Sequence, residues 1–182
     1  MKYKLRTKCL CCNKKNLKEI INLGLHSFAD RFVPKKKLHI KDPKYPLILD
    51  ICSNCKFIQS RAITNPKNRY LEIDYSYTSS NSNYSKNHWI EFANSLEKKI
   101  NLKNKKIIEI GSNDGFLSHL LKKKGADVLG VDASKFMVKI SQKKINAIQS
   151  IFNFQQSKKI KIFFGKADII IANNVFNHSD KP

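Results

Sequence analysis

The stretch KKIIEIGSNDGFLSHLLKKKGADVLGVDAS, Lys105–Ser134, decides the fold of this chain. An apolar run at 107–110 leads into a turn that contains Gly111 and Gly115. A segment with helical spacing and a second apolar run follow, and the second run ends at Asp132. The order strand, glycine turn, helix, strand and acid predicts a unit that holds a nucleotide-like ligand. The alternative is a parallel α/β scaffold without a ligand.

The residues of the turn favour one ligand class over another. Gly111 permits a sharp turn out of the strand, and Gly115 permits close approach of the backbone to a ligand. Dinucleotide sites prefer GxGxxG around a pyrophosphate, whereas this turn, Gly-Ser-Asn-Asp-Gly, contains Asp114. The Asp114 carboxylate would repel two phosphates, but not the ammonium and sulfonium groups of S-adenosylmethionine. Asp132 is placed to accept hydrogen bonds from both ribose hydroxyls. We therefore predict an S-adenosylmethionine site formed by Glu109, Gly111, Asn113, Gly115, Asp132 and Asn173.

Periodicity places further elements around this unit. The apolar spacing predicts helices at 88–100, 134–144 and 152–162, and strands at 145–150 and 167–172. The last strand is fully apolar, as expected in a parallel sheet that is covered on both faces. Asn173, Asn174 and His178 follow that strand, and ligands bind beyond the carboxyl ends of such strands. The predicted fold class is α/β, with a Rossmann-like parallel sheet. His88 begins the first helix and is expected to cap it or to pack.

Five cysteines lie in the first third of the chain. The spacings Cys9-x-x-Cys12 and Cys52-x-x-Cys55 predict two knuckles that complete a tetrahedral set of four thiolates for Zn²⁺. Four thiolates leave no open position, so we expect a structural site. Cys11 is an alternative to Cys12 as a ligand, and redox chemistry or incidental reduced cysteines are the alternatives to zinc. Residues 20–24 and 46–51 are expected to form short strands between the knuckles, whose turns Asn13 and Asn54 would tolerate.

Residues 70–84, YLEIDYSYTSSNSNY, are dense in Tyr and Ser. They fit a surface loop whose rings pack on the next domain, or an arm that offers hydroxyl donors to a substrate. In the second case, Tyr77 and Tyr75 are the candidate donors. Sequence alone leaves both alternatives open.

The composition bounds the partners of the chain. The formal net charge is +21, with 35 basic and 14 acidic residues. A charge of this size fits a polyanion partner, but the lysines are spread along the whole chain and do not alternate with aromatics in one region. Nucleic acid is therefore the less favoured partner. No apolar run is long enough to span a bilayer and no secretory pattern precedes the first knuckle, so we expect a soluble, cytoplasmic protein without a membrane partner.

Taken together, these motifs show that the sequence resembles bacterial sugar C-methyltransferases, which use S-adenosylmethionine to methylate deoxy-ketosugars linked to a nucleotide. The resemblance covers nearly the whole chain. The matching stretches are Cys9-x-x-Cys12, Leu23-Gly24, Cys52-x-x-Cys55, Asp74–Ser80, Glu109–Gly115, Val131-Asp132 and Ala167–His178.

The resemblance implies a zinc-binding domain at 1–67, a Tyr/Ser-rich arm and helix at 68–104, and an S-adenosylmethionine-binding domain at 105–182. The Asn65–Asn68 turn marks the first boundary. Members of the family are longer and end in a substrate domain. The resemblance therefore implies that this chain is the front half of such an enzyme, with a separately encoded C-terminal half as an expected partner.

Carbon methylation requires a proton next to a ketone to leave, so that an enolate carbon attacks the sulfonium methyl. His178 is the candidate base or acid, because the ordinary pKa of histidine lies near neutrality. Its alternative role is to hydrogen-bond the sugar or the backbone. Tyr77 or Tyr75 would donate to the enolate oxygen. The rival functions are a nucleic-acid methyltransferase whose knuckles and lysines grip RNA, and a zinc- and cofactor-binding protein without turnover.

Overall fold

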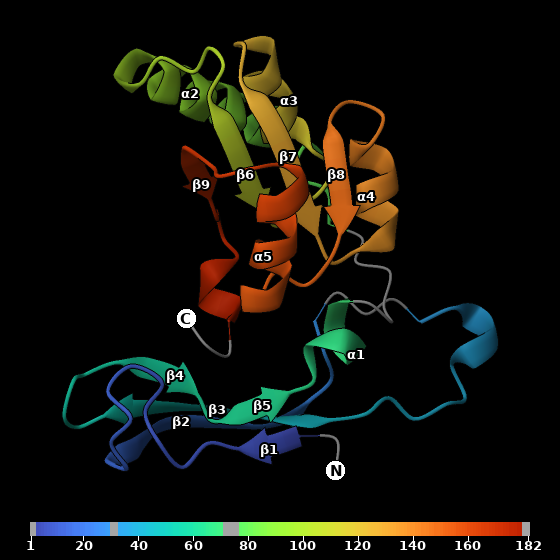
Figure 1. Ribbon diagram of the computed structural model, residues 1–182. Coiled ribbons are helices and arrows are strands. Elements are labelled where there is room, and N and C mark those ends of the chain that lie inside the picture. Colours follow the sequence, from blue (N-terminus) through green and yellow to red (C-terminus); the bar gives the residue numbers. More distant parts are fainter. Residues whose placement is uncertain (1–2, 30–32, 71–76, 180–182) are drawn as a thin grey trace. The chain divides into compact units, whose positions relative to one another are not determined.

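A computed structural model describes residues 3–29, 33–70 and 77–179. The chain divides into two compact units, each with its own secondary structure (Figure 1). The first unit combines Met1–Ile73 with the end of the chain, Asn177–Pro182. The second unit is Asp74–Phe176. Each unit is described by itself below.

The second unit is built on a parallel sheet. Its strands are β6 (Lys106–Ile110), β7 (Asp127–Asp132), β8 (Asn146–Gln149) and β9 (Ile169–Ile171), in the spatial order β8-β7-β6-β9. The chain moves outward from β6 to β8 and then crosses to β9 on the other side of β6 (Figure 1). The strand order therefore reverses between β6 and β9. Such a switch point leaves a crevice beyond the carboxyl ends of the strands, where ligands bind.

Helices cover both faces of this sheet. They are α2 (Asn83–Lys99), α3 (Phe116–Lys123), α4 (Lys135–Ser141) and α5 (Phe154–Phe163). Side chains of α2 and α3 pack with Ile107 of β6, whereas Ile160 of α5 packs with the neighbouring Ile108. Successive residues of a strand point to opposite faces, so α2 and α3 lie on one face and α5 on the other. Full burial of each aliphatic side chain contributes about 1.5–3 kcal/mol.

Helix starts follow their capping residues. Ser82 accepts a hydrogen bond from the Ser85 amide at 3.1 Å, so α2 begins at Asn83, one turn before the expected start at His88. His88 is therefore not the first residue, and its ring lies edge-on to Trp89 with centroids 4.8 Å apart. Ser134 and Asn153 cap α4 and α5 in the same way.

Strand β9 departs from the expectation that both of its faces would be covered. Ile169 and Ile171 pack with the cluster formed by α2 and α3, but Ile170 is 61% exposed. Among the described residues β9 is an edge strand, paired only with β6. The side chains of α5 pack over β6 and β7 and leave the Ile170 face of this edge uncovered.

The first unit is antiparallel. Its strands are β1 (Tyr3–Leu5), β2 (Leu17–His26), β3 (Tyr45–Cys52), β4 (Ile58–Ser60) and β5 (Ala62–Thr64). They form a β2-β3-β4 sheet and a β1-β5 pair. Short helical segments are η1 (Lys35–Lys37), α1 (Pro66–Tyr70) and η2 (Phe176–His178). The boundary turn expected at Asn65–Asn68 is the start of α1, where Asn65 Oδ1 accepts from the Lys67 amide at 3.0 Å.

Little apolar surface is buried in the first unit. Most side chains of β2 are exposed, including Leu23 and Leu25. The buried polar residue Asp50 accepts hydrogen bonds from Arg61 Nε at 3.1 and 2.9 Å and from Nη2 at 2.5 Å. A small sheet of this kind gains much of its stability from a metal or another crosslink.

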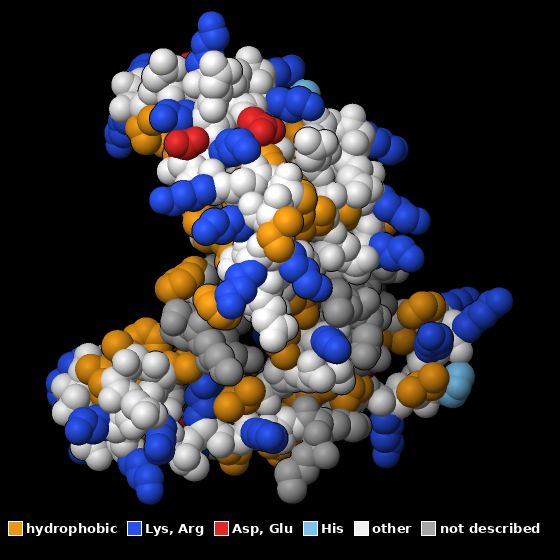
Figure 2. Space-filling view, in the orientation of Figure 1, with side chains coloured by type: hydrophobic (Ala, Val, Ile, Leu, Met, Phe, Trp, Pro, Cys, Tyr) orange, Lys and Arg blue, Asp and Glu red, His pale blue; other side chains and the backbone are white. Residues whose placement is uncertain are grey.

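Charged side chains are distributed broadly. Figure 2 shows Lys and Arg side chains spread over the visible surface of each unit, not gathered into one patch. Within residues 3–29, 33–70 and 77–179, no helix combines the length and the apolar character that crossing a bilayer demands.

Candidate functional site

The structure brings four cysteine sulfur atoms together in the first unit. Those of Cys9, Cys12, Cys52 and Cys55 all lie within 4.8 Å of one another. The Cys9–Cys55 and Cys12–Cys52 sulfur pairs are 3.5 and 3.6 Å apart. Zn–S bonds of about 2.3 Å in a tetrahedron separate the sulfurs by about 3.8 Å, so the set fits Zn²⁺.

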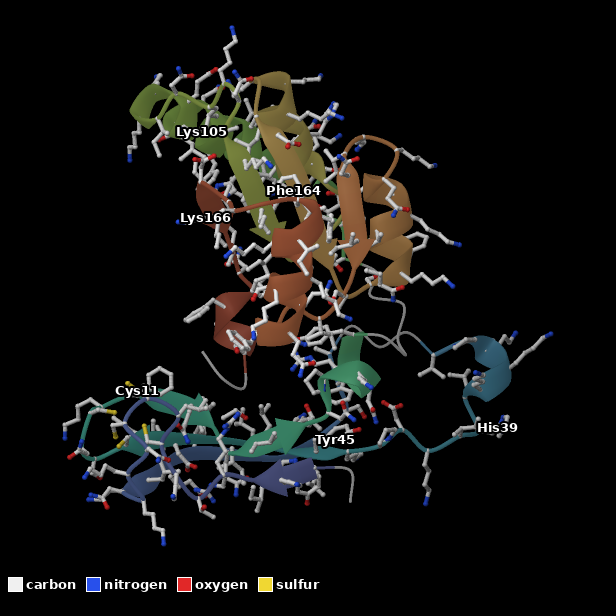
Figure 3. All side chains as sticks on the ribbon, in the orientation of Figure 1. Cys11, His39, Tyr45, Lys105, Phe164 and Lys166 are labelled. Carbon is white, nitrogen blue, oxygen red and sulfur yellow. The ribbon has the colours of Figure 1, made fainter. Side chains whose placement is uncertain are left out.

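Cys11 is exposed and is not a member of this set, although Figure 3 shows it close to the gathered sulfur atoms. Cys12, and not Cys11, is the second cysteine of the first knuckle whose sulfur lies in the cluster. The alternative in which Cys11 replaces Cys12 is therefore not the arrangement of this fold.

Backbone amides shape both knuckles. The first is closed by the Asn13 amide, which donates to Cys9 O at 3.0 Å, and the second by the Lys56 amide, which donates to Cys52 O at 2.9 Å. Asn13 and Lys56 have positive φ values of 59° and 63°. Asn54, expected to serve this turn, is not among the residues with positive φ. The amides of Cys55 and Asn54 also donate to the Cys52 sulfur and lower its pKa to about 7, which favours the metal-binding thiolate.

The second unit places Asp132 beside the turn that follows β6. Its Oδ2 accepts from the Asn113 amide at 2.8 Å, and its Oδ1 accepts from the Ser134 amide at 2.8 Å. Burial raises the pKa of Asp132, while the two amides lower it. Each carboxylate oxygen keeps a further lone pair, which a hydroxyl of a ligand can use.

Glu109 lies below this turn on β6 and is 6% exposed. Its Oε2 accepts from Ser118 Oγ at 2.5 Å, and the Ser118 amide of α3 also donates to the carboxylate. Burial is the main cause that raises the pKa of Glu109 to about 7, and the charges of Asp114 and Asp132 add to it. Glu109 therefore supports the turn from the interior of the domain.

Gly111 and Gly115 both adopt positive φ, at 70° and 73°. A Cβ on Gly111 would lie 2.2 Å from Val175 Cγ2, which shows that the loops after β6 and β9 are adjacent. A Cβ on Gly115 would lie 2.8 Å from Ser141 Cβ. Gly115 was expected to permit close approach to a ligand. What the structure shows instead is left-handed backbone and tight packing against α4.

The Asp114 carboxylate is used inside the protein. It is 3% exposed, it accepts from the hydroxyls of Ser79 and Ser80, and its Oδ1 accepts from the Phe116 amide at 3.3 Å. The preference for S-adenosylmethionine over a dinucleotide was based on the charge of this acid in the turn. In the structure the Asp114 carboxylate joins residues 79–80 to the first turn of α3.

The remaining predicted residues differ in how closely they approach the turn. The Asn113 side-chain amide donates to Tyr77 O at 2.9 Å. Asn173 follows β9, and its buried Nδ2 has no hydrogen-bond partner among the described residues. A buried donor of this kind is available to a ligand. Tyr75 lies outside the described residues. His178 is exposed in η2, within the first unit, so the fold of the second unit does not by itself bring it to the turn.

Sequence analysis missed Ser79, Ser80 and Ser118 as members of the site. The pairing of a Ser-Ser dipeptide with an acid 34 residues later is a tertiary contact without a local sequence signal. Ser118 lies nine residues after Glu109, and only the strand–turn–helix geometry brings the two together.

Comparison with known families agrees with this geometry. Residues 9–70 match a family described as a zinc binding domain, and residues 108–182 match a family described as a methyltransferase domain. The second unit has the Rossmann-like fold of class I methyltransferase domains, whose cofactor is S-adenosylmethionine, and the four clustered cysteines lie in the stretch that matches the zinc-binding family.

Individual relatives match parts of this chain. A ubiquinone biosynthesis O-methyltransferase of Coxiella burnetii is 32% identical over 90 residues, which are 48% of this chain and 38% of that protein. A ribosomal protein L11 methyltransferase of Caldanaerobacter subterraneus is 39% identical over 70 residues, 37% of this chain and 22% of that protein. The chain thus spans less than two fifths of the length of these relatives.

Among solved structures, magnesium protoporphyrin IX methyltransferase of Synechocystis with bound S-adenosylmethionine is 21% identical, with a TM-score of 0.41. The likeness covers 52% of this chain and 46% of that one.

The residues present fit S-adenosylmethionine on two observations. Asp132 is held by two amides with lone pairs to spare, and Asn173 has a buried donor without a partner in the described chain. Asp132 would hold the ribose, and Asn113, Gly111 and Asn173 would line the cofactor. When bound, S-adenosylmethionine supplies an electrophilic methyl group on its sulfonium.

Proposed function

We propose that this chain binds S-adenosylmethionine at the switch point of its parallel sheet and serves in methyl transfer to carbon of a nucleotide-linked deoxy-ketosugar. The observation that carries the cofactor part is Asp132, which two amides at 2.8 Å hold beside the turn. A carboxylate fixed in this way is preorganised to accept hydrogen bonds from both ribose hydroxyls, because its side chain loses little further conformational entropy on binding.

The acceptor part rests on the Tyr/Ser-rich arm and on the motifs shared with sugar C-methyltransferases. Tyr77 belongs to this arm. Its carbonyl oxygen accepts a hydrogen bond from the Asn113 side-chain amide, which lies in the turn after β6. A phenol at this place would donate to the oxygen of an enolate, which stabilises the charge that develops there. Tyr75 is proposed to assist in the same way.

His178 is proposed as the base that takes the proton next to the ketone. Partial desolvation lowers the pKa of His178, and the charge of Arg69 lowers it further. A lowered pKa keeps the imidazole neutral at pH 7, which is the form that accepts a proton. The zinc site would have a structural role, because four thiolates fill its coordination sphere.

Calorimetric titration of the zinc-loaded chain with S-adenosylmethionine tests the first step. Micromolar binding is expected, and absence of binding would overturn the proposal at its base. The acceptor is tested in deuterium oxide with a nucleotide-linked 4-ketosugar: mass spectrometry would show deuterium exchange next to the ketone and a gain of one methyl group.

Two other outcomes point to the rival functions. Cofactor binding without exchange or methylation of any ketosugar would favour a binding protein without turnover. Methylation of RNA, with an affinity that falls steeply with salt, would favour the nucleic-acid function. The net charge of +21 and a 33% identical stretch shared with a ribosomal RNA small subunit methyltransferase of Mycoplasma mobile make this the second candidate.

A further inference from the structure

Residues 77–80, here called the strap, are tied to the turn that follows β6 by a compact set of hydrogen bonds. The Ser79 amide donates to Asn113 Oδ1 at 2.9 Å, and the Ser80 amide donates to Asp114 Oδ2 at 3.3 Å. The hydroxyls of both serines donate to the Asp114 carboxylate. These partners are separated by 34 or 35 residues in sequence. The strap is therefore fixed by tertiary structure, not by local turn formation.

Burial makes this attachment strong. Asp114 is only 3% exposed, so its charge depends on hydrogen bonds from the protein. In the described residues its donors are the two strap serines and the Phe116 amide. Hydrogen bonds to a charged group contribute about 1.5–3 kcal/mol each, roughly twice the value for neutral pairs. Removing the serine hydroxyls would leave the buried Asp114 carboxylate with two long hydrogen bonds, from the Ser80 and Phe116 amides, both at 3.3 Å.

Asn113 connects the strap to the proposed ribose site. Its side chain accepts from the Ser79 amide and donates to Tyr77 O at 2.9 Å. Its own main-chain amide donates to Asp132 Oδ2 at 2.8 Å. The same residue thus contacts the strap through its side chain and the ribose-binding carboxylate through its backbone. Its positive φ of 52° sets the two groups in these directions.

We propose that the strap couples cofactor binding to the placement of the substrate arm, with Ser79 and Ser80 as positioning residues. S-adenosylmethionine at Asp132 further stabilises the conformation in which the Asn113 amide binds that carboxylate, and in this conformation the Asn113 side chain holds the strap that begins with Tyr77. Coupling between two sites is reciprocal, so loss of the strap attachment weakens cofactor binding. This inference rests on the proposed function, because it assigns the strap to the same site.

The test compares Ser79→Ala/Ser80→Ala with Ser79→Thr/Ser80→Thr, which keeps both hydroxyls. Ser157→Ala, whose hydroxyl donates to Phe154 O on exposed α5, is the matched control. Hydrogen–deuterium exchange of the peptide covering residues 77–84 is measured with and without S-adenosylmethionine, alongside calorimetric Kd values. Fluorescence of Trp89, the single tryptophan, reports whether each variant is folded.

In the native chain, S-adenosylmethionine should slow exchange of the Ser79 and Ser80 amides. The alanine pair should lose that protection and bind S-adenosylmethionine about tenfold more weakly, a factor that corresponds to 1.4 kcal/mol. The threonine pair and Ser157→Ala should retain both properties. A purely structural role of the serines would lower stability without removing cofactor-dependent protection, and this result would overturn the inference.

A second variant keeps the test independent of the buried acid. Asn113→Gly preserves the positive φ and the amide that binds Asp132, but it removes the side chain that holds the strap. It should expose the Ser79 amide to exchange while leaving the fold intact. If the native chain binds S-adenosylmethionine and strap exchange does not respond, the inference fails while the proposed cofactor site stands. If the native chain does not bind the cofactor, the proposed function itself fails.

Discussion

The main-chain amide of Asn113 donates to Asp132 Oδ2 at 2.8 Å, across 19 residues of sequence. This bond joins the turn after β6 to the end of β7, because the parallel register sets Ile110 opposite Val131. It fixes the carboxylate before any ligand arrives. The conformational entropy of the Asp132 side chain is therefore lost when the protein folds, and not when the cofactor binds.

Asp132→Ala should weaken S-adenosylmethionine binding by about a hundredfold or more. The variant removes acceptors for two hydroxyls, and each hydrogen bond to a charged group contributes about 1.5–3 kcal/mol. Calorimetry measures the Kd. Asp127→Ala, at the exposed opposite end of the same strand, is the control and should bind as the native chain does. Unchanged affinity in Asp132→Ala would remove Asp132 from the site.

Cys12→Ser should abolish stoichiometric zinc binding, whereas Cys11→Ser should retain one Zn²⁺ per chain. The reason is that Cys12 belongs to the cluster of four sulfurs and Cys11 is exposed outside it. Metal content by mass spectrometry distinguishes the two. Because the first unit buries little apolar surface, Cys12→Ser should also expose it to proteolysis. Full zinc retention by Cys12→Ser and loss by Cys11→Ser would reverse the ligand assignment.

Gly115→Ala should destabilise the methyltransferase domain more than Gly125→Ala. Both glycines have positive φ, 73° and 89°, so both variants carry a strain of about 1–2 kcal/mol. Only the Gly115 variant also creates a steric clash, since its Cβ would lie 2.8 Å from Ser141 Cβ. The nearest atom to a Cβ on Gly125 is 3.4 Å away. We expect about 1–3 kcal/mol of additional loss from this overpacking. Urea unfolding followed by Trp89 fluorescence measures it, and equal losses would contradict the packing argument.

The contribution of Glu109 to the free energy of unfolding of the methyltransferase domain should fall as pH rises from about 4.5 to about 7. Glu109 has its pKa raised from 4.5 to about 7, so the folded state binds more protons than the unfolded state across this range. At 1.36 kcal/mol per pKa unit, the loss attributable to Glu109 is about 3 kcal/mol. Asp132, whose pKa is also raised, acts in the same direction.

Glu109→Gln should flatten this pH dependence, because the amide does not ionise. Glu97→Gln is the matched control: Glu97 is half-exposed, pairs with Lys124 and should leave the slope unchanged. A native slope that survives in Glu109→Gln would show that another group is responsible.

Periodicity in the sequence predicted the methyltransferase fold well. The apolar runs, the glycine turn and the helical spacing are local features, and each corresponds to β6, α3 or β7 within one residue or so. Boundaries moved where a capping side chain decided them, as Ser82 does for α2. The covering of β9 could not be predicted, because exposure of Ile170 depends on which helix packs over the edge of the sheet.

Of the candidate site, the cysteine cluster could be predicted, and the cofactor-binding roles stay predictions. The CxxC spacing indicated that each pair shares one turn, and the structure brings the two pairs together. The acid at the end of the second strand was identified from its place after the glycine turn. The hydrogen bonds of Asp114 could not be predicted, because its partners Ser79 and Ser80 lie 35 and 34 residues away in the chain.

The sequence by itself determined the parallel α/β unit, its cofactor class and the two CxxC pairs, because each depends on local patterns and spacings in the chain, whereas the meeting of the two pairs across 40 or more residues is tertiary. Only the tertiary structure decided that Asp114 binds the strap, that Glu109 and Ser118 form a buried pair, and that Gly115 packs against α4. These are long-range contacts among buried polar groups and close-packed backbone. Their partners are chosen by the need to satisfy every buried hydrogen-bonding group once the sheet and helices have come together.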